Sequence, residues 1–254
     1  MRIAITRQVS PGIARCVLTH LERQSIDPGV AGAQHRRYET CLTELGCTVH
    51  SLPAEPDLPD SVFVEDVAVV LDELAVLTRP GAASRRPETA GVAAALAPYR
   101  RLVRIEPPGT LDGGDVLVAG RGVHVGRTTR SDESGIEQLR RLLGPEGYTV
   151  IPVEVHGCLH LKSAVTLVAP DTLLVNRDWV DVEVFPGKRL LEVDPGEPFA
   201  ANALRIGAQV VYPAAFPRTR ARLAAAGIEA VTVDVSELAK AEGAVTCCSL
   251  VFEG

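Results

Sequence analysis

The sequence of 254 residues lacks the features that mark several common classes of protein. It has no stretch of about 18 uncharged apolar residues that would span a membrane. The first 20 residues carry Arg2, Arg7 and Arg15 among short apolar stretches, so no continuous core of a signal peptide is present. No run of Lys and Arg marks a surface for a phosphate backbone, and the formal net charge is -6. We therefore expect a soluble, cytoplasmic protein with neither a membrane nor a nucleic acid as partner.

The six cysteines lack a pairing pattern. They stand at positions 16, 41, 47, 158, 247 and 248, with no CxxC pair and no repeated spacing. This distribution argues against a disulfide framework and against a structural zinc site. Adjacent Cys247 and Cys248 can hardly bond each other without strain, and on a strand their side chains point to opposite faces. At most one of the two can face a given site.

Phosphate-binding glycine motifs are missing as well. The 22 glycines form neither a GxGxxG pattern nor a Walker loop, so no nucleotide cofactor is indicated. Disorder is excluded because 46% of the residues are hydrophobic. The length allows one large domain or two small ones, and either can bury a substantial core.

What the sequence does contain is a repeat in which a polar cluster runs directly into a short apolar strand. Its copies are anchored at Asp66, Asp115, Ser163, Asn202 and Ser249, and the copy at Asn202 is the weakest. The spacings between these anchors are 49, 48, 39 and 47 residues. Periods of this size indicate several similar supersecondary units.

Each unit is expected to continue with a second strand, an Arg-containing loop, a helix and a further strand. Helices are predicted where apolar residues recur every three to four positions, at 87–96, 133–143 and 217–226. Second strands are predicted at 75–78, 122–125 and 172–175, and closing strands at 101–105, 149–155 and 229–233. Because no linker divides the chain, we predict one α/β domain over residues 1–254, with about five strand-strand-helix-strand units around one axis. In a closed ring, the polar strand starts converge on the centre.

The polar residues at these strand starts include the groups that nucleophilic catalysis needs. They are the carboxylates of Glu65, Asp66, Asp112 and Asp115, the imidazole of His160 and the thiols of Cys247 and Cys248. A thiolate can attack while an imidazole, oriented by a carboxylate, moves the proton. Acids at the base of a site, with Arg85 and Arg130 at its rim, fit a zwitterionic ligand with a cationic end and a carboxylate end.

Each of these features also has an ordinary structural interpretation. His160 stands between two leucines, where a hydrogen-bonded core histidine is the common case. Glu65-Asp66 and the segment 112–115 have the composition of turns. Arg85 and Arg130 lie in loops, where an arginine is more often a solvated charge. Neighbouring carboxylates in a cleft repel each other, however, and a cationic ligand relieves that repulsion.

Five segments of the chain, taken in order, resemble those of one enzyme family. They are Phe63–Val70, Thr78–Arg86, Leu111–Leu117, Leu159–Ser163 and Leu238–Ser249. Together they are similar to the dimethylarginine dimethylaminohydrolases of the guanidine-modifying (pentein) superfamily, and the similarity extends over nearly the whole chain. The resemblance implies a five-bladed pseudosymmetric α/β propeller forming a single catalytic domain, in agreement with the repeat. It also implies hydrolysis of Nω-methylated arginines to citrulline and di- or monomethylamine.

The resemblance further implies catalytic roles. Cys247 matches the nucleophile, which would form a covalent thiouronium with the substrate. His160 matches the general acid and base, and Asp112 matches the carboxylate that orients it, although some relatives have Glu there. No metal and no organic cofactor are expected, the substrate is the only small-molecule partner, and a homodimer is left open.

Eight residues are matched to substrate binding by the same resemblance. Glu65 and Asp66 match acids that bind the guanidinium group, and Arg85 and Arg130 match binders of the substrate carboxylate. The remaining contacts are Asp60, the carbonyl of Leu18 and the backbone near Ala241 for the α-amino group, and Phe63 for the substrate stem. Ser131-Asp132 replaces the Thr-Asn pair of the family pattern, a departure beside Arg130.

Three other functions remain as alternatives. Arginine deiminases use the same thiol, imidazole and acids on free arginine, but they usually carry an extra helical insertion for which this chain has no spare length. An amidinotransferase would also need a site for an acceptor amine. A noncatalytic propeller that binds a partner would be expected to have a degenerate site, whereas all the reactive groups are present here.

Overall fold

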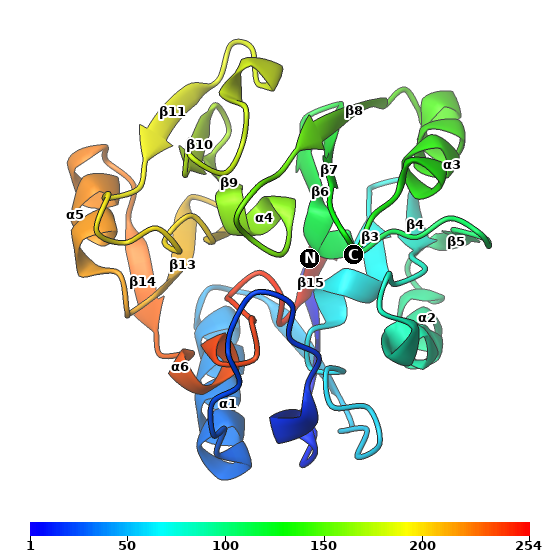
Figure 1. The fold of residues 1–254 in the computed structure, drawn as a ribbon, viewed down its shortest axis with the longest axis horizontal. Helices are drawn as coiled ribbons and strands as arrows, with labels where there is room; N and C mark the ends of the chain where they lie inside the picture. Colours follow the sequence, from blue (N-terminus) through cyan, green and yellow to red (C-terminus); the bar gives the residue numbers. More distant parts are fainter.

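Five three-stranded sheets lie around a common centre in the computed structural model of this chain, which describes residues 1–254 (Figure 1). The strands are β1 (Arg2–Arg7), β2 (Thr48–Leu52), β3 (Ala68–Val70), β4 (Leu74–Leu77), β5 (Arg101–Arg104), β6 (Val116–Ala119), β7 (Gly122–Arg127), β8 (Thr149–Glu154), β9 (Val165–Ala169), β10 (Thr172–Val175), β11 (Arg189–Glu192), β12 (Leu204–Ile206), β13 (Gln209–Pro213), β14 (Ala230–Val233) and β15 (Leu250–Glu253). The α-helices are α1 (Pro28–Glu44), α2 (Thr89–Leu96), α3 (Glu133–Leu143), α4 (Leu161–Ala164), α5 (Pro217–Ala225) and α6 (Ser236–Ala239).

All five sheets have the same internal pattern. The first strand pairs antiparallel with the second, and the second pairs parallel with the third. Four sheets are consecutive in the chain, namely β3-β4-β5, β6-β7-β8, β9-β10-β11 and β12-β13-β14. The repeated unit predicted from the sequence is thereby confirmed, and so is the α/β class with five blades.

The fifth sheet joins the two ends of the chain. It has the order β15-β1-β2, with Arg2 opposite Glu253 and Ile5 opposite Leu250. Both ends are drawn near the centre of Figure 1. The ring is therefore closed by backbone hydrogen bonds between the first and last strands.

The first strand of each blade borders the centre of the ring. β9 lies against β12, β15 lies against β3, and β6 lies against β9. Each of these strands comes shortly after one of the polar anchors of the repeat. The arrangement brings residues that are about 50 positions apart in the sequence to one place.

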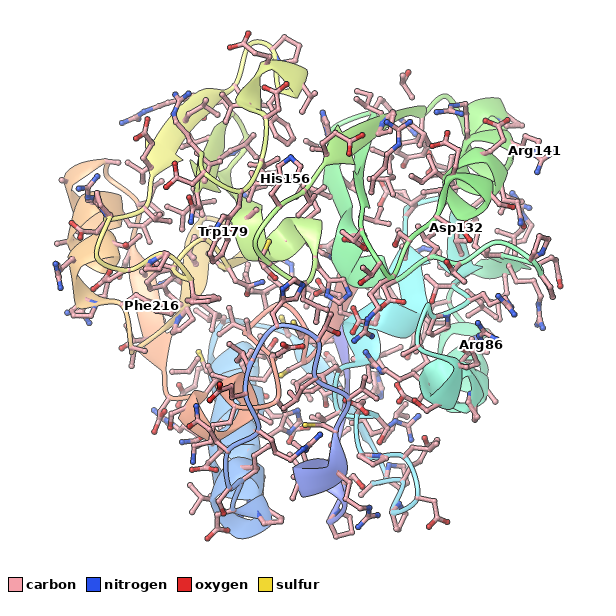
Figure 2. All side chains as sticks on the ribbon, in the orientation of Figure 1. Arg86, Asp132, Arg141, His156, Trp179 and Phe216 are labelled. Carbon is pink, nitrogen blue, oxygen red and sulfur yellow. The ribbon has the colours of Figure 1, made fainter.

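The helices agree with their predicted positions where the apolar periodicity is strong. The predicted helix 133–143 is α3, and its Asp132, visible in Figure 2 at the start of that helix, accepts a hydrogen bond from the amide of Gly135 (2.8 Å). The predicted helix 217–226 is α5, and 87–96 begins as a 3-10 turn that becomes α2. The blade of β9, β10 and β11 has no α-helix between its second and third strands, only the 3-10 turn Val182–Val184.

The long helix α1 was not among the sequence predictions. Its start carries two signals that could have located it: Pro28 at the first position, and Asp27, whose carboxylate accepts from the amides of Gly29 and Val30. None of the helices combines the length and apolar composition needed to cross a bilayer.

The buried apolar side chains form clusters between neighbouring blades. One cluster joins the sheet of β3 to that of β6 under α3, and another joins the sheet of β9 to that of β12 under α5. The largest lies under α1 and includes Tyr38 and Cys248. Because the apolar contacts lie between the blades, the centre is left to polar side chains.

Tyr38 of α1 connects this largest cluster to the segment before β15. Its ring is fully buried, and its hydroxyl donates to the carbonyl of Val245 (2.8 Å) and shares a hydrogen bond with Ser249 Oγ (2.6 Å). These two bonds hold the chain on both sides of Cys247.

We predict that Tyr38→Phe lowers the free energy of unfolding by about 1–3 kcal/mol, because a buried carbonyl and a buried hydroxyl lose their partner. Urea unfolding followed by circular dichroism measures the change. Tyr99→Phe is the matched control, since the Tyr99 hydroxyl bonds to His50 at an exposed position. Equal losses in the two variants would contradict the role given to Tyr38.

Candidate active site

A cavity of about 20 Å³ brings together most of the residues that the sequence singled out. It is lined by Val17, Asp60, Phe63, Asp66, Arg85, Arg130, Leu159, His160, Ala241, Glu242, Gly243 and Cys247. Eight of the eleven predicted site residues are in this lining. The other three lie outside the lining. Asp112 is bonded to His160, Leu18 follows Val17 in the chain, and Glu65 is turned toward Lys162.

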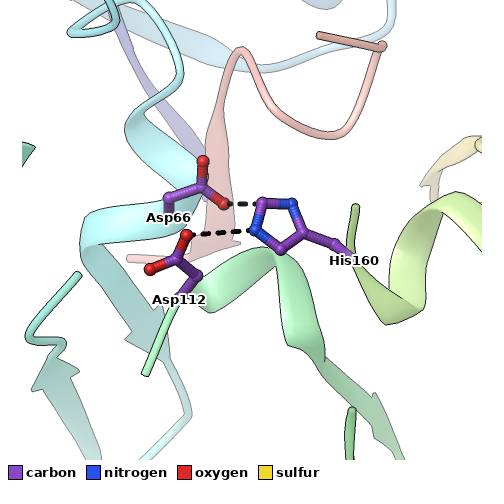
Figure 3. A group of neighbouring side chains, drawn as sticks. All are labelled: Asp66, Asp112 and His160. Atoms are coloured by element: carbon purple, nitrogen blue, oxygen red, sulfur yellow. Dashed lines mark hydrogen bonds and ion pairs between the residues drawn. The ribbon is translucent and has the colours of Figure 1, made fainter. Parts of the chain in front are cut away.

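His160 is held between two carboxylates. Its Nε2 lies 3.0 Å from Asp112 Oδ2, and its Nδ1 lies 3.8 Å from Asp66 Oδ1 (Figure 3). Asp112 is completely buried and is itself fixed, because its Oδ1 accepts from the amide of Gly81 (2.9 Å). The hydrogen bond to Asp112 therefore orients the ring, and the catalytic role that the family resemblance implies for Asp112 stays a prediction.

Two glycines allow this close packing. A Cβ atom at Gly113 would lie 2.0 Å from the carbonyl oxygen of Glu65, and one at Gly114 would lie 2.6 Å from His160 Nδ1. The amide of Gly114 also donates to Asp66 Oδ1 (3.1 Å). Glycine is therefore required at both positions, because a side chain there would collide with the backbone of Glu65 or with the imidazole of His160.

The opposite charges of His160 and the carboxylates around it stabilise each other's ionised forms. Burial alone would lower the pKa of His160, but the carboxylates of Asp66, Asp115 and Asp112 raise that pKa to about 9. Burial alone would raise the pKa of Asp66, but His160 and Arg85 hold it at about 2. At neutral pH the site therefore contains an imidazolium beside an ionised Asp66.

Arg85 lies in the wall of the cavity, which corrects the prediction that it stands at the rim. Its guanidinium group is buried and donates to Asp66, to Glu88 and to the carbonyls of Phe63 and Asp60. The 3-10 turn Ala83–Glu88 directs it inward. In this position Arg85 keeps Asp66 ionised.

Arg130 contacts both the catalytic group and a loop that lies over the cavity. Its Nη1 lies 3.6 Å from Asp112 Oδ2, and its Nη2 donates to the hydroxyl of Thr19 (2.9 Å). The same loop is held at Val17, whose amide lies 3.2 Å from both carboxylate oxygens of Asp60. The loop includes Leu18, but it is Val17 that lines the cavity.

Glu242 fastens this loop from the opposite side. Its carboxylate accepts from three consecutive backbone amides, those of Thr19, His20 and Leu21, at 2.5–3.0 Å. It is also the one residue other than glycine with a positive φ, at 60°. The sequence carried no signal for this contact, because the partners are more than 220 positions apart.

Of the two adjacent thiols, only that of Cys247 faces the cavity. Cys247 is half-buried, whereas Cys248 is fully buried and its Sγ lies 3.5 Å from the carbonyl of Ala244. Burial raises the pKa of the Cys247 thiol well above its usual range, and the charges of Glu65 and Asp66 raise it further. These surroundings therefore favour the neutral thiol.

Glu65 points away from the cavity, which separates it from Asp66. Its carboxylate pairs with Lys162 (2.5 Å) and accepts from the hydroxyl of Thr246 (2.8 Å). Both partners line a second cavity of about 420 Å³ together with Glu65. The predicted direct contact of Glu65 with a guanidinium is therefore not supported by its orientation, and Lys162 is a charge that sequence reasoning missed.

Asp66, Asp112 and His160 also place metal-ligating atoms within 4.8 Å of one another. The guanidinium groups of Arg85 and Arg130, with the imidazolium, already balance these carboxylates. The arrangement is accounted for without a bound cation.

We predict that Gly114→Ala displaces the imidazole of His160 and weakens its hydrogen bond to Asp112. Turnover should fall about 100-fold, because misplacement of a reacting group by about 1 Å has this effect. The pKa of His160, followed by NMR, should fall below about 9. Gly144→Ala is the control, since nothing lies within 4 Å of a Cβ there; the prediction is wrong if both variants behave alike.

Comparison with known proteins gives relatives over nearly the whole chain. No family model matches the sequence. An N(G),N(G)-dimethylarginine dimethylaminohydrolase of Streptomyces coelicolor is 43% identical over 249 residues, which cover 97% of this chain and 95% of the relative.

Two solved structures are similar over the same extent. A cysteine-to-serine variant of the Pseudomonas aeruginosa enzyme, complexed with citrulline, is 30% identical with a TM-score of 0.91 and covers 98% of each chain. A histidine-to-glycine variant of a dimethylarginine dimethylaminohydrolase, as an adduct with S-methyl-L-thiocitrulline, is 31% identical with a TM-score of 0.93, covering 99% of this chain and 100% of the other. The resemblance stated from the sequence is confirmed: this chain belongs to the dimethylarginine dimethylaminohydrolase family.

Proposed function

We propose that this chain hydrolyses asymmetric dimethylarginine and monomethylarginine to citrulline and di- or monomethylamine. Family membership at 43% identity supports this activity. The observation that carries it is the juxtaposition, in the lining of one cavity, of a thiol at Cys247, an imidazolium at His160 and an acid at Asp66 that stays ionised. This set of groups suits a guanidinium cation with a carbon to be attacked.

Binding of the cation prepares the nucleophile. Asp66 is the acid that points into the cavity, so it accepts hydrogen bonds from the substrate guanidinium. The positive charge of the substrate lowers the cost of ionising Cys247, because an opposite charge stabilises the thiolate. Substrate binding and loss of the thiol proton to solvent are thus coupled.

The thiolate of Cys247 then attacks the central guanidinium carbon to form a tetrahedral adduct. His160 donates its proton to the methylated nitrogen, the C–N bond breaks, and a covalent thiouronium remains. The now neutral His160 takes a proton from water, whose oxygen adds to the same carbon. The C–S bond then breaks, and the hydroxyl proton of the adduct passes to the departing sulfur, which releases citrulline and restores the neutral thiol and the imidazolium.

The amino acid end of the substrate is assigned to the other side of the cavity. Arg130 supplies a positive charge for the carboxylate, and Asp60 supplies a negative charge for the α-amino group. Both presently bond to the loop that contains Val17 and Thr19. Phe63 and the backbone at Ala241 line the space for the stem.

Four broader expectations remain proposals. Residues 1–254 are proposed to act as one catalytic domain, which the pairing of β1 with β15 supports. A cytoplasmic location and the absence of a nucleic acid partner are proposed from the sequence alone. A homodimer is compatible with all of these features.

The experiment that tests the substrate class measures citrulline after incubation with asymmetric dimethylarginine, monomethylarginine and arginine. We expect turnover of the two methylated compounds and little of arginine. Citrulline from arginine alone would favour an arginine deiminase activity. Binding without turnover of any guanidine would favour a noncatalytic propeller.

The assignment of the nucleophile is tested by two neighbouring substitutions. Cys247→Ser should reduce kcat by a factor of about 10³ or more, as removal of a nucleophile does. Cys248→Ser should keep most of the activity, because that thiol faces away from the cavity. Mass spectrometry of the quenched wild-type enzyme should show the thiouronium on Cys247; an adduct on Cys248 would reverse the assignment.

A further inference from the structure

Asp115 is a buried carboxylate that the proposed mechanism does not use. Its side chain is completely buried, and it does not line the substrate cavity. Its Oδ1 accepts from the amide of Leu161 (3.0 Å), and its Oδ2 accepts from the hydroxyls of Ser131 (2.6 Å) and Thr128 (2.7 Å). One carboxylate thus receives three hydrogen bonds from two different segments.

Each of these partners adjoins a group of the active site. Leu161 directly follows His160 in the chain. Ser131 Oγ also accepts from the amide of Asp112 (3.0 Å), the residue that orients the imidazole. Thr128 Oγ1 accepts from the amide of Arg130 (3.0 Å). Asp115 therefore links the backbones that carry His160, Asp112 and Arg130.

Asp115 also contributes to the charge around His160. The imidazole is surrounded by Asp66, Asp112 and Asp115, by the guanidinium groups of Arg85 and Arg130, and by the thiol of Cys247. Burial raises the pKa of Asp115 to about 6, against the opposing charge of His160 and the hydrogen bonds from Ser131 and Thr128. Above that pH Asp115 is ionised and favours the imidazolium.

We propose that Asp115 is a positioning residue that fixes His160 against Asp112 and keeps the imidazole protonated for the departing amine. It touches neither the substrate nor the reacting atoms. Its effect on the reaction is exerted through the hydrogen bonds to Leu161 and Ser131. This inference rests on the proposed function, since it concerns the general acid of that reaction.

Asp115→Asn removes the charge while it keeps the size of the side chain. The alkaline limb of the kcat profile should move to lower pH by about one unit, the size of shift that a lost neighbouring charge produces. At pH 8 this shift alone should lower kcat about twofold, and loss of the position of the imidazole should bring the total to about tenfold or more, because general acid catalysis contributes about 10²–10⁴-fold. KM should change less than about threefold, since no group in contact with the substrate is altered.

Ser131→Ala distinguishes the positioning effect of Asp115 from the effect of its charge. It breaks the link between Asp115 and the amide of Asp112 but leaves the carboxylate ionised. We expect a lower kcat with the alkaline limb unmoved, and recovery of kcat in Ser131→Thr, which restores the hydroxyl. If Asp115→Asn does not fold, this pair decides the proposal: an unchanged kcat in Ser131→Ala overturns it.

Glu197 is the matched control. It is also a buried carboxylate, and it accepts from the amides of Arg218 (3.0 Å) and Thr219 (2.8 Å) at the start of α5, far along the ring. Glu197→Gln should reduce stability and leave the pH profile in place. The proposal is overturned if Glu197→Gln moves the alkaline limb as far as Asp115→Asn does, or if Asp115→Asn leaves both kcat and the limb unchanged.

A second readout does not depend on turnover. NMR titration of His160, assigned with His160→Asn, should give a pKa near 9 in the wild type and a value about one unit lower in Asp115→Asn. If the wild type hydrolyses no methylated arginine, the proposed function fails while this titration still tests the link from Asp115 to His160. Equal pKa values in the two proteins would overturn the inference alone.

Discussion

The balance of buried charge at the centre of the ring is the constraint on which the rest of the site depends. An ionised carboxylate out of water is stable only beside compensating charge and hydrogen bonds. Asp66 has both, from Arg85 and His160, and Asp112 has the imidazole and Arg130. For Cys247 the charge of Lys162 is outweighed by burial and by the charges of Glu65 and Asp66, so the raised pKa keeps its thiol neutral. Addition of a substrate cation and loss of the thiol proton together leave the buried charge unchanged, so the nucleophile is favoured only when there is something to attack.

The five-bladed ring supplies these groups from different blades. Asp66 precedes β3, Asp112 and Asp115 precede β6, His160 precedes β9, and Cys247 precedes β15. No one blade holds more than part of the set. The hydrogen bonds of Asp115 and Tyr38 hold these segments to one another, which is why single positions outside the cavity are expected to affect the chemistry.

The sequence predicted most of the architecture because the repeat is strong in hydrophobic pattern. The strand starts at the polar anchors and the helix at 133–143 followed from that pattern alone, while α1 was missed although Asp27 and Pro28 mark its start. The roles of the site residues came from the family resemblance. Spacing alone could not assign them, because some Cys, His and acid can be combined into a hypothetical triad in almost any sequence. The sequence did not predict the direction in which the site side chains point. Glu65 and Asp66 are consecutive in a 3-10 turn of about three residues per turn, so they point to different sides.

Contacts between distant segments were beyond the reach of pattern reasoning. The inward path of Arg85 and the bonds of Glu242 to the loop at 19–21 depend on how the backbone folds back, and neither residue stands in a distinctive local pattern. The Ser131-Asp132 departure, in contrast, has a clear outcome. Ser131 supplies the hydroxyl between Asp112 and Asp115, and Asp132 caps α3, so both side chains are fully engaged.

The closure of the ring by β15 on β1 has a consequence for folding. Pairing of Arg2 with Glu253 brings together segments separated by nearly the whole described chain, and contacts of such long range form late and slowly. Cys247 stands three residues before β15, so its thiol reaches the other reactive groups only after this strand has docked. The enzyme therefore becomes active only when the entire fold is complete. Partial opening of the sheet of β15, β1 and β2 would abolish activity while the other four blades remained folded.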